Sequence, residues 1–142
     1  MATSMYEPVV LAASAAVTAT GNGSAFRLPE CRGLGFVLDL TNAATDVGDE
    51  LDVSIQMKLD GTNWVDVVHF TQILGNGSNT LRFFGKISAD GAMTMFENGS
   101  ALAAAAIRNL IGLEMRAAWV VVPDADDPAD QTFTFSVVAI PM

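Results

Sequence analysis

The sequence predicts an all-β chain, folded as an antiparallel β-sandwich or jelly roll with at most one short helix near residues 100–110. Residues 51–59 alternate apolar and polar side chains, which is the period of a strand with one solvated face. Asp60 and Gly61 then supply a turn, and a second run rich in valine and aromatic residues begins at Trp64. Residues 51–70 therefore indicate an antiparallel hairpin. The chain lacks the strand–helix–strand spacing of a parallel sheet.

The other strands are expected in chain order. Residues 8–13 and 17–20 are expected as two short strands, the first at a sheet edge because Pro8 has no N–H to donate to a ladder. Residues 24–28 predict a weak strand that ends at Pro29. Further strands are expected over residues 35–41, 79–87, 93–97, 112–122 and 131–140. Together with the hairpin these give about eight to ten strands, typical of a sandwich.

Residues 100–110, SALAAAAIRNL, depart from this pattern. They are good helix formers, and Ser100 is a suitable N-cap, so one or two helical turns are expected. The alternative is a face of small residues that packs against a neighbouring chain. Helix propensity is a weak criterion, so both interpretations stay open.

Turn signals separate the expected strands. Three Asn-Gly-Ser triplets begin at Asn22, Asn76 and Asn98. Each matches a glycosylation acceptor, but the opening MATSMYEPVV lacks the basic region of a signal peptide, so we expect folding in a reducing cytoplasm. The triplets are therefore interpreted as turns, since Asn and Gly tolerate positive φ.

Length and composition indicate one domain over residues 1–142. The chain is 51% hydrophobic and 16% charged, which argues against disorder and suggests that other subunits cover some apolar surface. Residues 1–8 carry Met5 and Tyr6 before the apolar run that starts at Val9. Two interpretations stay open: an extended N-terminal arm that adds a strand to a partner, or a strand that closes the chain's own sheet, which is favoured.

The net charge of −9 disfavours partners that are themselves anionic. Seven basic residues are scattered singly among 16 acidic ones, whereas nucleic-acid binding needs a clustered basic footprint. Anionic membrane surfaces are disfavoured for the same reason. No run approaches the ~20 apolar residues that cross a bilayer.

Residues suited to catalysis are few, and we expect no enzyme and no cofactor. Cys31 is the only cysteine and is interpreted as a small buried hydrophobic residue. His69 is the only histidine, and strand alternation places it on the face of Val65 and Val67, with Asp66 on the other face. We therefore expect a structural histidine. One His and one Cys also cannot supply a zinc site.

Two acidic segments are weak candidates for a calcium site. The first lies in PDADDPADQ and the second precedes the hairpin; their members are Asp124, Asp126, Asp127 and Asp130, and Asp46, Asp49, Glu50 and Asp52. Calcium binds clustered oxygen ligands, but neither segment has the EF-hand order. A plain solvated loop is favoured, although two loops at one end of a sandwich could share an ion.

Exposed aromatic residues would suggest a sugar-binding platform. Tyr6, Trp64 and Trp119 are the candidates; Trp119 lies in an apolar run and is expected in the core, whereas Trp64 follows a turn. The remaining aromatics on inward strand positions are Phe36, Phe70, Phe83, Phe133 and Phe135.

The chain resembles the small β-rich virion proteins of tailed bacteriophages, especially capsid decoration or cement proteins. The resembling segments are LAASAAVTATGNGSAFRL, RGLGFVLDLTNAA, LDVSIQMKLDGTNWVDVVHF and QTFTFSVVAIP, and they cover most of the chain in order. They are framework strands and turns, so no binding residue of the family can be carried over.

The resemblance implies a jelly roll or sandwich that assembles as a dimer or trimer on the outer surface of a capsid. Its partners would be the major capsid protein and its own copies, and its role would be to strengthen the head. Related sandwiches occur in phage necks and tails. The alternative is therefore a neck- or tail-associated binding module, assisted by carbohydrate or calcium.

Overall fold

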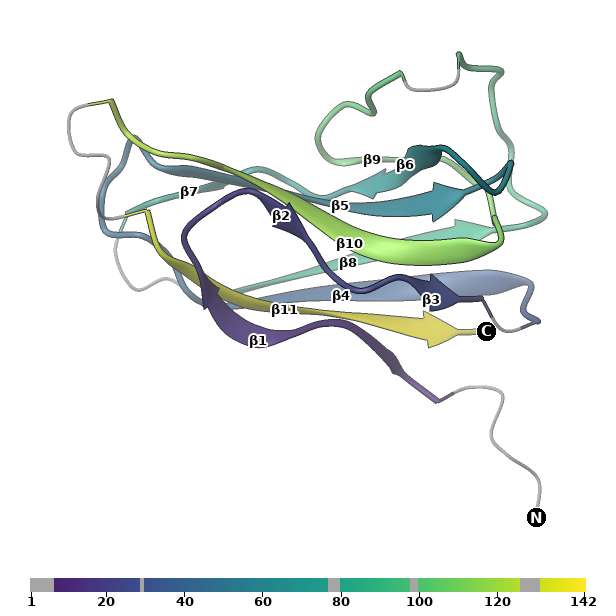
Figure 1. Cartoon of the computed structure of the whole chain (residues 1–142), viewed down its shortest axis with the longest axis horizontal. Helices are drawn as coiled ribbons and strands as arrows, with labels where there is room; N and C mark the ends of the chain where they lie inside the picture. The colour runs from purple at the N-terminus through teal and green to yellow at the C-terminus, as the bar shows by residue number, and fades with distance from the viewer. Residues whose placement is uncertain (1–6, 29, 77–79, 98–99, 126–130) are drawn as a thin grey trace.

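The computed structural model describes residues 7–28, 30–76, 80–97, 100–125 and 131–142, which form eleven strands and no helix (Figure 1). None of these residues therefore belongs to a helix that could span a membrane. The strands build two antiparallel sheets packed face to face, which confirms the all-β sandwich. The finer jelly-roll topology stays a prediction.

The four-stranded sheet has the order β1 (Val9–Val17), β11 (Phe133–Pro141), β4 (Gly33–Asn42) and β8 (Leu81–Ser88). The seven-stranded sheet has the order β2 (Gly21–Asn22), β10 (Glu114–Val122), β5 (Glu50–Lys58), β6 (Trp64–His69) and β9 (Ala106–Ile107). In addition, β3 (Phe26–Arg27) pairs with β10, and β7 (Ile73–Leu74) pairs with β5. Chain-distant strands are thus neighbours in both sheets.

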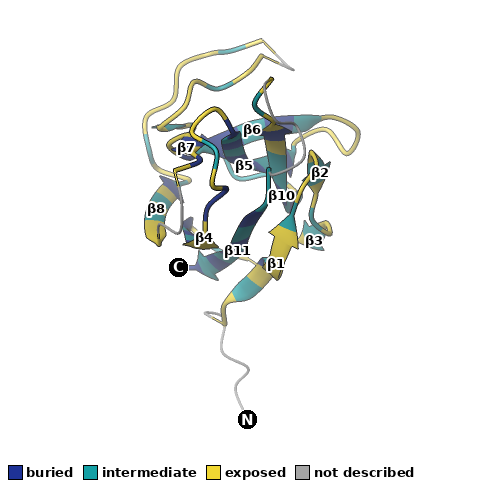
Figure 2. Ribbon diagram, turned by 90° about the vertical axis from the view of Figure 1, so that its left-hand side faces the viewer, coloured by how far each residue is buried: buried dark blue, intermediate teal, exposed yellow. Residues whose placement is uncertain are grey.

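Alternating side chains from both sheets fill one hydrophobic core. Strand β5 buries every second residue, and β11 follows the same alternation. Phe36, Phe133 and Phe135 are among the largest fully buried side chains, and partly buried Phe83 packs against the core from β8. Figure 2 shows these buried positions between the sheets, whereas the edge strand β1 and the loops are largely exposed. Removal of this apolar surface from water stabilises the sandwich.

The expected hairpin is present as β5 and β6, with Lys58 opposite Trp64. Its turn is formed by the predicted pair, Asp60 and Gly61. Gly61 has φ of 78°, and Asp60 Oδ1 accepts hydrogen bonds from the amides of Thr62 (2.9 Å) and Asn63 (2.7 Å). A glycine adopts this left-handed conformation without the steric cost of a Cβ atom. Local sequence therefore defines this turn.

The N-terminal prediction needs one correction. In place of two short strands, β1 runs continuously over Val9–Val17, because its register shifts between Val10 and Ala15 and so keeps its pairing with β11. As expected, β1 is an edge strand, and it closes the chain's own sheet. Residues 1–6 lie outside the described residues, so the arm stays a prediction.

Of the two interpretations of residues 100–110, the helical one is not realised: these residues contain a turn and strand β9, which agrees with a fold of at most one short helix. Ala105 has a left-handed φ of 60°, which interrupts any right-handed helix there. The carbonyls of Ser100 and Ala101, which a helix would use internally, accept hydrogen bonds from the Arg108 guanidinium. Tertiary contacts thus override helix propensity.

Other segment boundaries also differ from the expectations. Residues 93–97 form no strand, and the weak strand over 24–28 is reduced to β3. Asn22 lies in β2 rather than in a turn, while residues 77–78 and 98–99 of the other two triplets are outside the described residues.

Candidate binding surfaces

His69 does not lie on the face that strand alternation predicts. In the β5–β6 ladder Ile55 pairs with Val68 and Gln56 with Asp66, which leaves Val67 as an extra, bulged residue. Val67 and Val68 are consequently both buried, and His69 moves to the outer face of the seven-stranded sheet. Val67 and Val68 are two consecutive apolar residues in a strand whose side chains otherwise alternate, and this is the sequence feature that indicates the bulge.

On this outer face, both ring nitrogens of His69 have partners. Nε2 lies 3.1 Å from Asp52 Oδ1, and Nδ1 lies 2.8 Å from the carbonyl oxygen of Leu102. Gln72 donates a 3.0 Å hydrogen bond to the other oxygen of Asp52. Because a carbonyl only accepts, Nδ1 carries a proton and donates to Leu102.

This arrangement differs from a catalytic triad, although Ser54 pairs with His69 across the strands. In a triad one imidazole nitrogen faces a carboxylate and the other faces the nucleophile. Here the second nitrogen is bonded to Leu102, on the loop that precedes β9. The geometry suits a side chain that holds this loop against the sheet.

Trp64 lies in a polar network on the same outer face. The Arg116 guanidinium carbon is 4.2 Å from the centroid of its ring, and Lys58 Nζ is 5.0 Å from it. Arg116 Nε also donates a 2.9 Å hydrogen bond to Gln56 Oε1, and burial lowers the pKa of Arg116. Cation–π contacts of this kind hold the indole in place. The ring therefore serves intramolecular contacts rather than forming an open sugar platform.

Trp119 packs against the core, as expected. Its ring meets Phe135 edge to face, with centroids 5.5 Å apart, and its Nε1 donates a 3.1 Å hydrogen bond to the carbonyl of Ala19. Cys31 is half-buried against the core, and burial raises the pKa of its thiol. A raised pKa disfavours the thiolate and hence nucleophilic chemistry.

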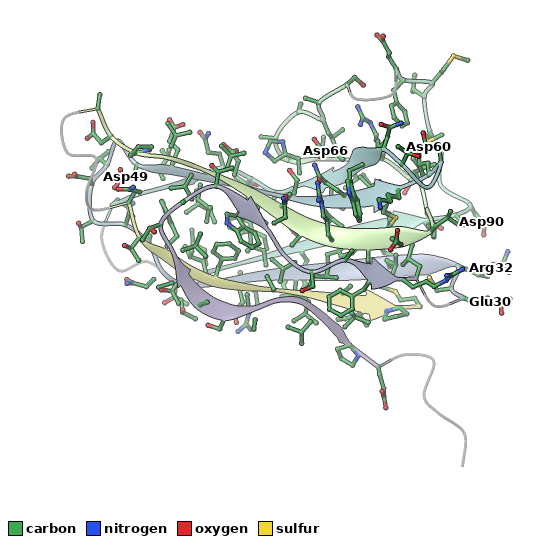
Figure 3. All side chains as sticks on the ribbon, in the orientation of Figure 1. Glu30, Arg32, Asp49, Asp60, Asp66 and Asp90 are labelled. Atoms are coloured by element: carbon green, nitrogen blue, oxygen red, sulfur yellow. The ribbon has the colours of Figure 1, made fainter. Side chains whose placement is uncertain are left out.

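The two acidic segments do meet at one end of the sandwich. Asp49 is fully buried there, at the end opposite Asp60 and Arg32 (Figure 3). Its Oδ1 accepts a 2.7 Å hydrogen bond from the amide of Asp124, whereas its Oδ2 has no hydrogen-bond partner within the described ranges.

The acidic candidates do not assemble a metal centre in the described part of the chain. No group of three or more His, Cys, Asp or Glu side chains there could hold an ion. Asp126, Asp127 and Asp130 lie outside the described residues. Asp52, the last member of the second group, is engaged by His69 and Gln72.

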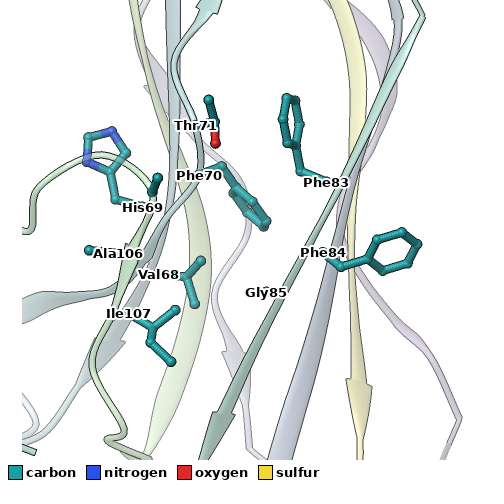
Figure 4. A pocket seen from close by; sticks show the side chains of 10 residues that line it. Val68, His69, Phe70, Thr71, Phe83, Phe84, Gly85, Ala106 and Ile107 are labelled. Atoms are coloured by element: carbon teal, nitrogen blue, oxygen red, sulfur yellow. The ribbon is translucent and has the colours of Figure 1, made fainter.

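A small apolar cavity of about 160 Å³ separates β8 from β6 and β9. Figure 4 shows Phe70 and Phe83 at this cavity, while Phe84 leaves the opposite side of β8 and His69 points away. Its lining offers no acid–base pair, since His69 is already bonded elsewhere.

The outer face of the four-stranded sheet carries a partly exposed apolar row that sequence reasoning missed, with Val10 and Phe84 exposed and Val37 and Val138 half-buried. Register places Val10 opposite Val138, Val138 opposite Val37, and Val37 opposite Phe84, so the row crosses all four strands. Phe84 is 75% exposed and Val10 is 50% exposed. We call these four residues the apolar row.

A second exposed apolar surface lies in the connection between β8 and β9. Met95 is 94% exposed and Met93 is 48% exposed, and the Arg108 guanidinium lies over the ring of Phe96, 4.1 Å from its centroid. We call residues 92–97 the methionine loop. It lies beyond the seven-stranded sheet, on the side of the molecule away from the four-stranded sheet (Figure 1).

Comparison of the chain with protein-family models, with curated proteins and with solved structures finds no match.

Proposed function

We propose that this chain is a structural virion protein that decorates a tailed-phage capsid. In this role it binds the major capsid protein and its own copies on the outer surface of the shell, and acts by adhesion rather than catalysis. The resemblance in framework segments suggested this role, and the distribution of exposed apolar side chains supports it.

One observation carries the proposal: two opposite surfaces, the apolar row and the methionine loop, each bring exposed apolar side chains close together. Contiguous apolar patches on a soluble surface mark sites of protein association. A protein that bridges capsomers needs adhesive surfaces that face different partners. Unbranched methionine side chains adapt to an irregular partner surface, which suits the methionine loop to a capsid contact.

A binding experiment tests the role. The purified chain is mixed with expanded phage shells that lack decoration, and the shells are sedimented. We expect saturable co-sedimentation, which replacement of Met93 and Met95 by serine weakens. Val47→Ser is the matched control, because Val47 is 72% exposed in the 43–49 segment, outside both surfaces. Failure of the unmodified chain to bind any shell would contradict the proposal.

The meeting of Asp49 with Asp124 favours a second candidate, a cation-assisted binding module of a phage neck or tail. The buried, unpartnered Oδ2 of Asp49 is the specific observation, because a cation would satisfy such an oxygen. Calcium that binds only the native state would raise the melting temperature. We expect a shift of several degrees that Asp124→Ala abolishes; an unchanged melting temperature with calcium excludes this candidate.

A further inference from the structure

The apolar row borders a hollow on the same face of the four-stranded sheet. This hollow, of about 250 Å³, is mainly apolar, and Lys86 is its only charged lining residue; the other residues that line it are Gly35, Phe36, Val37, Phe84, Gly85, Ile140 and Met142. Gly35 lies in the wall of this hollow beside Met142, because a Cβ atom at residue 35 would lie 2.7 Å from Cε of Met142. Phe84 stands at the edge of the hollow with 75% of its surface exposed. A projecting aromatic ring and a recess of suitable size are thus neighbours.

The charge of this face differs from that of the rest of the molecule. The four strands β1, β4, β8 and β11 contain one acidic residue, Asp39, and two basic residues, Arg82 and Lys86. Arg82 and Asp39 neutralise one another through a 3.3 Å ion pair, so the charge of Lys86 is the one not neutralised within these four strands. The whole chain has a net charge of −9. Two copies therefore repel least when these faces approach each other.

From these observations we propose that the outer face of the four-stranded sheet binds a second copy of this chain about a two-fold axis. This inference rests on the proposed assembly function and names the partner of the apolar row. In a two-fold pair the same patch serves both copies, so it must be complementary to itself. Phe84 of each copy then fills the hollow beside Phe84 of the other copy and contacts Ile140 and Met142.

The size of the face suits a modest, specific dimer. Four strands about 4.8 Å apart and about nine residues long cover about 19 Å by 30 Å, or about 570 Å² in projection. A typical specific interface buries about 800 Å² of accessible surface per partner, and accessible surface exceeds the projection of a corrugated face. The polar pair of Asp39 and Arg82 then forms part of the rim, as in other protein interfaces.

The native mass of the isolated chain tests this inference. It is measured by light scattering under reducing conditions, which exclude disulfides through Cys31. We expect a dimer that dissociates on dilution. Phe84→Ala should raise its dissociation constant about 30-fold, and Phe84→Asp should leave a monomer. Met95→Asp is the matched control, since Met95 is exposed but lies in the methionine loop. Far-ultraviolet circular dichroism spectra that match the spectrum of the unmodified chain establish that the variants fold.

A native mass of one or three subunits overturns the inference, as does a dimer that Phe84→Asp leaves intact. Because no shell is present, the result is independent of the proposed function. A dimer that fails to bind shells removes the capsid role and keeps this inference. A monomer that binds shells supports the capsid role and overturns this inference. If Phe84→Asp does not fold, Phe84→Ala and Val37→Thr provide the same comparison.

Discussion

The main-chain amide of Asp124 donates a 2.7 Å hydrogen bond to Oδ1 of Asp49, which joins two loops that are 75 residues apart in sequence. Asp49 also orders its own loop, since its amide bonds to the carbonyl of Asp46 and its carbonyl accepts from the amide of Gly75. Three connections at one end of the sandwich are thereby fixed by one residue. The acidic pattern predicted a candidate ion site, and the structure adds a hydrogen bond by which Asp49 joins these loops.

Asp49→Ala should lower the free energy of unfolding by about 2 kcal/mol, because it leaves the amide of Asp124 without its hydrogen-bond acceptor. Asp49→Asn keeps an oxygen that can accept this hydrogen bond and should cost about half as much. Urea denaturation followed by circular dichroism measures both values. Equal losses for Asn and Ala would show that the hydrogen bond to Asp124 contributes nothing.

Trp119→Ala should destabilise the chain by about 2 to 3 kcal/mol, since it removes a half-buried ring that joins β10 to Phe135 of the other sheet. Trp119→Phe keeps a ring but loses the hydrogen bond to Ala19, and should cost about 1 kcal/mol. Val120→Ala, at the exposed neighbouring position, serves as control, with a change within about 0.5 kcal/mol. Chemical denaturation followed in the far ultraviolet reports all three, and similar values for Ala and Phe would refute the packing role.

The turn of the hairpin should make stability depend on pH in the acidic range. Hydrogen bonds from Asn63 and Thr62 lower the pKa of Asp60 to about 2. A depressed folded-state pKa contributes stability that is present above the unfolded-state pKa and is lost as the pH falls toward the folded-state value. The melting temperature of Asp60→Asn should therefore lie below that of the unmodified chain at pH 6, and the gap should close between about pH 4 and about pH 2.

Asp90→Asn is the control for this pH series. Asp90 and its partner Arg32 are both exposed to solvent, and an exposed ion pair of this kind contributes little to stability. A gap for Asp60→Asn that stays constant down to pH 2 would show that the turn hydrogen bonds do not favour the carboxylate.

His69→Ala should loosen the loop before β9, because both of its ring contacts, to Asp52 and to Leu102, are lost. The amide of Arg108 donates to the carbonyl of Val67 beside this loop, and its hydrogen exchange should become about tenfold faster. The amide of Leu113, bonded to Lys58 beside the hairpin turn, should be unaffected. Exchange measured by NMR gives both rates, and an unchanged rate at Arg108 would mean that His69 does not hold the loop.

Strand identity was the most predictable part of this fold, because it depends on local periodicity. The alternation over residues 51–59 and the Asp60-Gly61 turn require only neighbouring residues, and both are found in β5 and its hairpin. Predicted strands over 35–41, 112–122 and 131–140 correspond to β4, β10 and β11 with ends that differ by at most two residues. The prediction failed where non-local contacts compete with propensity, as in residues 100–110.

The candidate surfaces were far less predictable, because each depends on pairing between distant strands. One bulged residue, Val67, moved His69 to the other face of its sheet and gave it Asp52 and Leu102 as partners. The same dependence applies to the acidic loops, which only the sandwich brings together.

The sequence by itself determined the class of this protein: alternating strands and turn residues give strands with one apolar face, and two sheets bury these faces against each other. Only the tertiary structure decided which residues face outward together. The apolar row requires Val10, Val37, Phe84 and Val138 to share one register line, although up to 128 residues separate them. Strand order and register arise from packing across the whole chain, so no local pattern could have shown this surface.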